Sequence, residues 1–94
     1  MMTSYDFMKL AKQKIAEYLE FKCGRDVDWT KVQTSWLHSA FNYHTGAFFV
    51  DEPDVPLFDA SYNGNSKMLY LNVYQKIDSA DIKVEESDAD DKAQ

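Results

Sequence analysis

The spacing of the apolar residues changes at Gly24, and this change limits the possible folds more than any other feature of the sequence. Before Gly24 the apolar residues recur every three or four positions, as on a helix with one buried face. After Gly24, β-branched and aromatic residues become frequent, which is typical of strands. The sequence therefore predicts one helix followed by a sheet. The apolar stripe of the helix consists of Phe7, Ala11, Ile15, Tyr18 and Leu19.

The predicted helix has a recognisable residue pattern at each end. Thr3 is placed to cap the first free N–H groups, and Asp6, three residues later, completes a capping box. Gly24 adopts the left-handed conformation at low cost, so we expect the helix to end near Lys22 or Cys23. The side of the helix away from the stripe is basic, and its cations are Lys9, Lys12, Lys14, Lys22 and Arg25.

Four strands are expected after the helix. The β-branched and aromatic residues that indicate the first two strands lie within residues 29–36 and 41–50, and we expect the chain reversal between these strands at residues 42–46. Residues 51–56 form a loop because two prolines cannot donate to a central ladder. The other two strands form a hairpin over residues 57–77 around Asn63 and Gly64, which tolerate the positive φ angles of a tight turn. We predict an α+β fold, with an N-terminal helix packed on a four-stranded antiparallel sheet.

The second hairpin has two distinct faces. A two-residue loop at Asn63 and Gly64 and a four-residue loop through Ser66 both pair even positions with odd ones, so both give the same faces. One face is apolar and carries Phe58, Ala60, Leu69, Leu71 and Val73. The other face carries Asp59, Ser61, Tyr70, Asn72 and Tyr74.

The face with Tyr70 and Tyr74 is the candidate binding surface. Tyrosine offers a large contact area with little loss of rotamer entropy and is enriched at interfaces. A single helix covers only one face of a sheet. Three alternatives stay open: the face binds a partner, another element covers it, or it forms a homo-oligomer.

Charge is distributed unevenly along the 94 residues. Residues 78–94 carry a net charge of −5 out of −6, so the preceding residues are almost neutral. We expect a single domain over residues 1–77 and an acidic, disordered tail over residues 78–94. The loop acids Asp51, Glu52 and Asp54 form a second candidate contact, suited to an arginine-rich groove. Direct nucleic-acid binding by the basic helix side is the least favoured alternative.

The sequence predicts a cytoplasmic protein without enzymatic turnover. No apolar run approaches the roughly 20 residues that span a bilayer, no secretory signal pattern is expected, and the one cysteine forms no internal disulfide. No pattern of catalytic residues is found, so an enzyme is not expected. No cofactor is expected, with zinc left as an alternative. Its candidate ligands are Cys23, His38 and His44, completed by Asp26 or Asp51.

A longer pattern lies in the strands. The pattern lies within residues 28–82 and consists of Trp36 and Leu37, then Tyr62, Asn63 and Gly64, and finally residues 70–76. In this respect the chain resembles a family of small uncharacterised proteins encoded by phages and prophages of Gram-positive bacteria. The resemblance implies phage origin. Small phage accessory proteins often inhibit host defence, and some are anti-CRISPR proteins that block the RNA-guided nuclease Cas9.

Together these observations predict a phage-encoded inhibitor that binds a host defence protein or nucleoprotein complex, with an anti-CRISPR protein acting on Cas9 as one form. It would use Asp59, Tyr70, Asn72 and Tyr74 with the 51–54 loop and would block its target sterically. The alternative is a phage structural or assembly accessory protein that associates with itself.

Overall fold

Helix α1 (Ser4–Cys23) begins and ends where its capping residues predict. The Thr3 side chain accepts a hydrogen bond from the Asp6 backbone, and the Asp6 carboxylate accepts one from the Thr3 backbone, which completes the capping box. Gly24 ends the helix with a left-handed φ of 65°. One face of α1 is fully buried, through Phe7, Ala11, Ile15 and Leu19.

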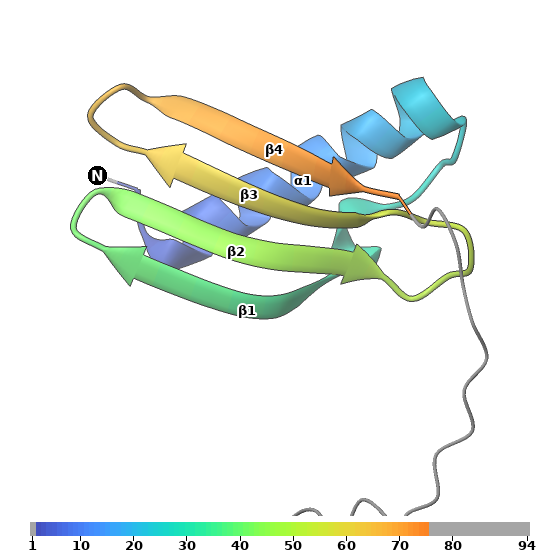
Figure 1. Cartoon of the computed structure of the whole chain (residues 1–94), viewed down its shortest axis with the longest axis horizontal. Coiled ribbons are helices and arrows are strands. Elements are labelled where there is room, and N and C mark those ends of the chain that lie inside the picture. Colours follow the sequence, from blue (N-terminus) through green and yellow to red (C-terminus); the bar gives the residue numbers. More distant parts are fainter. Residues whose placement is uncertain (1, 76–94) are drawn as a thin grey trace, which may run out of the picture.

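The computed structural model describes residues 2–75 (Figure 1). After α1 come a 3-10 turn, η1 (Trp29–Lys31), and the strands β1 (Val32–Ala40), β2 (Tyr43–Val50), β3 (Leu57–Asn63) and β4 (Met68–Tyr74). The strands form one antiparallel sheet in the order β1-β2-β3-β4, with α1 packed on one face. The α+β prediction is therefore confirmed, whereas the predicted tail and the boundary at residue 77 lie outside the described residues.

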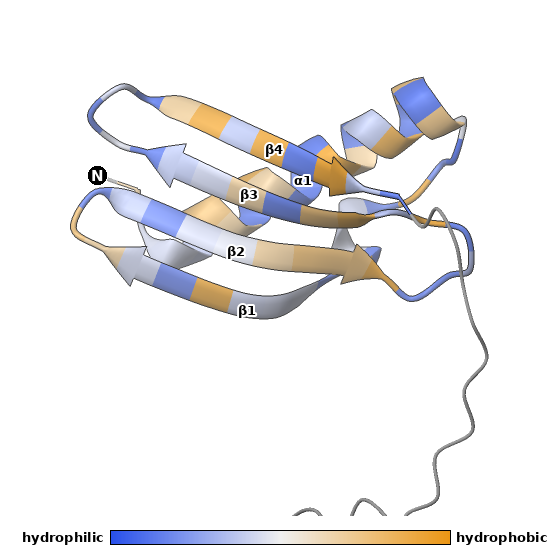
Figure 2. Cartoon of the chain, viewed as in Figure 1, coloured by the Kyte–Doolittle hydropathy of each residue, from blue (hydrophilic) through white to orange (hydrophobic). Residues whose placement is uncertain are grey.

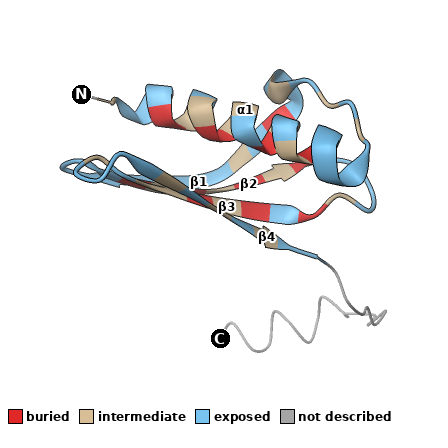
Figure 3. Cartoon of the chain, turned by 90° about the horizontal axis from the view of Figure 1, so that it is seen from above, coloured by how far each residue is buried: buried red, intermediate tan, exposed pale blue. Residues whose placement is uncertain are grey.

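The core lies between α1 and the sheet. Alternate residues of the strands point toward the helix, as the period of two in a strand requires. Phe7 packs against Phe48 with ring centroids 6.3 Å apart, and Tyr18 meets Phe58 edge-on at 5.9 Å. Figure 3 shows the buried residues concentrated between these two layers. On the sheet side the core consists of Val32, Phe48, Val50, Phe58 and Ala60.

The first chain reversal was predicted in the wrong place. It lies at Phe41 and Asn42, and residues 43–46 belong to β2 instead. Gly46 is needed within the strand, since a Cβ there would lie 2.9 Å from the Trp36 carbonyl oxygen and 3.2 Å from the Phe48 ring. The longer strand also places His44 under α1, stacked on Phe7. Trp29 and Thr30 likewise belong to η1, because Asp28 caps that turn.

The second hairpin keeps the predicted faces and has a four-residue loop, one of the two predicted lengths, but its positive φ lies at another residue. β3 pairs with β4 from Asn63 and Met68 to Leu57 and Tyr74, which leaves a four-residue loop over residues 64–67. The positive φ falls on Lys67, at 57°, and not on Asn63 or Gly64. Gly64 instead allows close approach to the first turn, because its N–H donates to the Asn42 carbonyl at 2.8 Å. The pairing still joins even positions to odd ones, so the assignment of the faces is confirmed.

Candidate interaction surface

The face of the sheet turned away from α1 is not covered by any other element of residues 2–75, and we call it the open face. It points toward the viewer in Figures 1 and 2 and lies on the side opposite the helix in Figure 3. The strand registers place one cross-strand row through its middle. That row consists of Trp36, Ala47, Asp59 and Asn72.

Large aromatic and apolar side chains stand on the open face and remain in contact with solvent. Tyr70 and Tyr74 are each 54% exposed, and Trp36 on the opposite edge strand is 50% exposed. Figure 2 shows apolar and polar residues interleaved along the strands. Aromatic side chains that span a sheet without cover form an apolar patch of the kind that marks binding surfaces. The other exposed members are Tyr43, Leu57 and Met68.

The centre of the open face is polar. The Tyr74 hydroxyl donates a hydrogen bond to Asp59 Oδ2 at 3.0 Å. This bond and the negative charge of Asp59 raise the pKa of Tyr74 above its ordinary value, because both favour the protonated phenol. Asp59 Oδ1 is shielded from solvent and accepts no hydrogen bond from the described residues. The aromatic patch therefore surrounds a carboxylate with unused acceptor capacity.

The structure brings together four of the seven predicted partner-binding residues: Asp59, Tyr70, Asn72 and Tyr74 lie on the open face of β3 and β4. Sequence reasoning missed the contribution of β1 and β2, namely Trp36, Tyr43 and Phe49. In β2, buried residues alternate with exposed or partly buried ones, and the misplaced reversal concealed this alternation at the start of the strand. The candidate surface is therefore wider than predicted and spans all four strands.

The other three predicted partner-binding residues, Asp51, Glu52 and Asp54, lie in the loop between β2 and β3 and are exposed. Arg25 Nη1 donates to the Pro53 carbonyl at 3.3 Å, which ties the loop to the segment after α1. The loop joins the ends of β2 and β3 near Leu57, which pairs with Tyr74. The acids thus lie at one end of the open face rather than within it.

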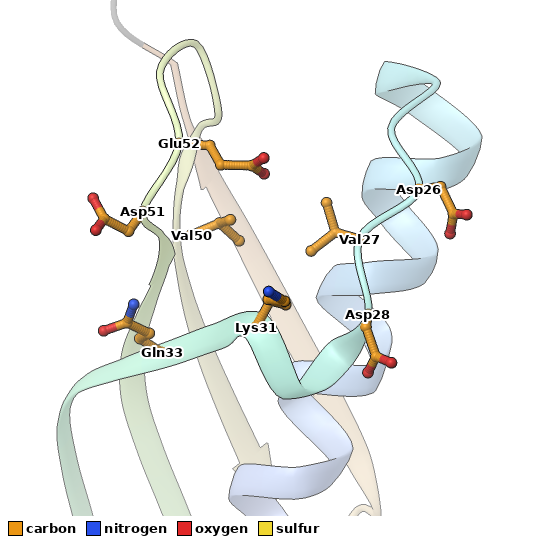
Figure 4. A pocket seen from close by; sticks show the side chains of 8 residues that line it. All are labelled: Asp26, Val27, Asp28, Lys31, Gln33, Val50, Asp51 and Glu52. Carbon is orange, nitrogen blue, oxygen red and sulfur yellow. The ribbon is translucent and has the colours of Figure 1, made fainter.

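A hollow of about 550 Å³ separates this loop from the segment between α1 and β1 (Figure 4). Val27 and Val50 face each other across it, and Lys31 lies at its base. Asp28 on its wall accepts hydrogen bonds from the Thr30 backbone and hydroxyl, both at 3.0 Å, and these lower the pKa of Asp28. Asp51 and Glu52 contribute to the wall on the loop side and Asp26 and Asp28 to the opposite wall, so four of the eight lining residues are acidic.

The zinc candidates lie in different parts of the molecule. Cys23 is exposed at the C-terminal end of α1, whereas His44 is buried beside Phe7, near the N-terminal end. His38 pairs with Thr45 and stands on the open face, on the other side of the sheet from His44. Both ring nitrogens of His44 have partners, Ser39 Oγ at 2.6 Å and the Met2 carbonyl at 3.1 Å. Within residues 2–75, no three His, Cys, Asp or Glu residues are grouped as metal ligands.

The basic side of α1 is partly engaged by its own neighbours. Lys14 forms an ion pair with Glu17 at 3.2 Å, and the Lys9 ammonium lies 5.6 Å from the centre of the Trp29 ring. These contacts reduce the cationic surface available for a polyanion. Within the described residues, no helix is both long and apolar enough to cross a membrane.

Residues 8–84 match a family of unknown function, DUF6275. The match covers more than three quarters of the chain and extends from α1 past the end of β4. No curated protein matches, and no solved structure matches. The chain belongs to the DUF6275 family.

Proposed function

We propose that this member of the DUF6275 family is a binding protein that docks the open face of its sheet on a partner protein and blocks it sterically. The observation that supports this proposal is the exposure of Trp36, Tyr70 and Tyr74 on one continuous face. Buried aromatic residues are explained by stability, but exposed ones on a sheet contribute little to folding. Their presence on one face fits an interface centre that loses water on binding.

The charge of the chain favours a partner with a basic surface. The exposed acids of the 51–54 loop lie at one end of the open face and accelerate association with cationic proteins over a Debye length of about 8 Å at physiological salt. Proteins that bind nucleic acids carry such cationic grooves. Asp59, whose Oδ2 accepts the hydrogen bond from Tyr74, adds a negative charge at the centre of the face.

A phage-encoded inhibitor of host defence is the form of this function that we propose. Support for phage origin comes from the sequence resemblance carried by Trp36, Leu37, the Tyr62 to Gly64 turn and residues 70–76. A host nucleoprotein complex such as guide-loaded Cas9 combines a basic groove with large protein surfaces, and it is the first target to test. Steric inhibition requires no catalytic residues, only occupation of a site that the substrate must reach.

The test measures inhibition of purified, guide-loaded Cas9 and capture of host proteins from a Gram-positive bacterial lysate by the tagged protein. We expect the double variant Tyr70→Ala, Tyr74→Ala to lose affinity by about tenfold or more, as for residues at an interface centre. The matched control is Tyr5→Ala, Phe21→Ala, which removes two exposed aromatics from α1 instead.

The stoichiometry of inhibition separates this function from catalysis. A steric inhibitor reaches its full effect near one equivalent of target, whereas an enzyme continues to inactivate target below that ratio as time passes. Equal binding by the open-face variant and the α1 control would contradict the proposal. The protein could fail to inhibit Cas9 and still capture another host protein through its open face. That result would overturn only the choice of Cas9 as the target.

A further inference from the structure

The two edges of the sheet differ in their protection against pairing. An edge strand presents unpaired N–H and C=O groups, and proteins usually block such an edge with charges, prolines, bulges or a covering element. β1 is interrupted by an irregularity between Thr34 and Trp36. β4 is a regular strand of seven residues, Met68–Tyr74, without charge, proline or bulge. Within residues 2–75, β4 pairs on one side only, with β3.

The residues of β4 that face the helix layer are incompletely buried. α1 contacts β1, β2 and β3 more extensively than β4, and Figure 3 shows β4 as the strand farthest from α1. Leu69, Leu71 and Val73 are therefore only partly buried, although they pack at the margin of the core. The β4 edge therefore presents unpaired backbone N–H and C=O groups next to partly exposed apolar side chains.

We infer that β4 pairs with β4 of a second copy of this chain in an antiparallel arrangement, which joins two four-stranded sheets into one sheet of eight strands. A two-fold axis perpendicular to the sheet keeps both helices on the same side and both open faces on the other. In such a pair, odd-numbered residues must lie opposite odd-numbered ones and even-numbered residues opposite even-numbered ones, because residues that lie opposite each other point to the same face of the sheet. With the axis at the central residue, Leu71 meets Leu71 of the second copy.

The side chains of β4 are compatible with their own symmetry mates. In the register centred on Leu71, Leu69 meets Val73 on the helix side, and Tyr70 meets Asn72 on the open face. A two-fold interface brings each residue near its own copy, so charged residues there would repel. β4 contains none, although the whole chain has a net charge of −6. Self-pairing therefore completes the apolar layer without opposing like charges.

The paired sheet extends the open face instead of covering it. Tyr70 and Tyr74 of the two copies then lie on one continuous surface. The inference concerns the edge of the sheet, whereas the proposed function concerns its face, so either can fail while the other stands.

The test measures the molar mass of the full chain in solution, under reducing conditions because Cys23 is exposed. Light scattering after size exclusion, from micromolar to near-millimolar protein, should give twice the 10.9 kDa chain mass at high concentration. Leu71→Lys should restore the monomer, since two lysines would meet at the axis. The matched control, Leu37→Lys on the β1 edge, should still dimerise; circular dichroism verifies that both variants fold.

A distance measurement keeps the inference falsifiable if Leu71→Lys fails to fold. Spin labels at Asn72→Cys in a Cys23→Ser background should report backbone positions within about 10 Å across the two copies, since paired strands lie about 4.8 Å apart. Labels at Ser35→Cys on β1 should lie about 30 Å apart or more, because seven strand spacings separate them. A monomer at every concentration, a dimer unaffected by Leu71→Lys, or a short distance between β1 labels would overturn the inference.

Discussion

The two faces of the sheet share one backbone and both carry aromatic residues, but their surroundings differ. Phe48 and Phe58 on the helix side are buried, whereas Tyr70 and Tyr74 on the open face are about half exposed. Burial of an apolar side chain contributes roughly 1.5–3 kcal/mol to folding, and an exposed one contributes much less. The helix-side aromatics are therefore accounted for by folding, and those of the open face are not.

Replacing adjacent phenylalanines on opposite faces should give the largest difference between these regions. Phe48→Ala empties the centre of the core, so we expect a loss of about 3–5 kcal/mol in the free energy of unfolding. Phe49→Ala, one residue away on the open face, should cost less than about 1.5 kcal/mol. Urea denaturation followed by fluorescence measures both. Similar losses for the two variants would mean that the open face is also part of the core.

The helix side of β2 should also resist the addition of a single methyl group. Gly46→Ala places a Cβ against the Trp36 carbonyl, the Leu37 side chain and the Phe48 ring, and at least the carbonyl has to move. We expect a loss of about 1–3 kcal/mol, typical of overpacking. The thermal midpoint of unfolding reports this change. A loss below about 0.5 kcal/mol would show that β1 and β2 separate easily, and would weaken the contrast between the faces.

A smaller effect of opposite sign is expected at the β1–β2 turn. Phe41 is fully exposed and has a φ of 54°, a conformation that favours glycine over a bulky residue. Phe41→Gly should raise stability by about 1 kcal/mol, because it removes a left-handed non-glycine residue and no buried contact. Chemical denaturation measures the gain. Unchanged or lower stability would show that the Phe41 ring contributes contacts in the folded chain.

The smallest effect concerns the polar centre of the open face. The raised pKa of Tyr74 means that folding favours its protonated form, so this stabilisation is present below the ordinary phenol pKa and is lost as pH rises through the folded value. Asp59→Ala should lower the pKa of Tyr74 toward about 10. Absorbance titration, with Tyr74→Phe subtracted to isolate this phenol, measures the change. An unaltered pKa would mean that Asp59 does not hold the hydroxyl.

Local chemistry made much of the fold predictable. The capping residues Thr3, Asp6 and Gly24 act within one turn of the helix, so the ends of α1 follow from their identities alone. The faces of β3 and β4 also follow from the sequence, because every turn considered pairs even with odd positions. For this reason Asp59, Tyr70, Asn72 and Tyr74 were placed together correctly although two loop lengths were left open.

Contacts between distant residues decided the rest. The sequence from Asn42 to Gly46 favours a turn, but Gly46 serves the close packing of β1 on β2, and Gly64 serves the contact with Asn42. A glycine in the sequence is compatible both with a turn and with a close approach between two backbone segments, so only the tertiary structure separates the two roles. The open face likewise joins Trp36 of β1 with Tyr70 and Tyr74 of β4 through three strand registers. The sequence by itself determined the helix, the sheet and the two faces of the last hairpin, whereas the tertiary structure decided which face α1 covers and how far the uncovered face extends.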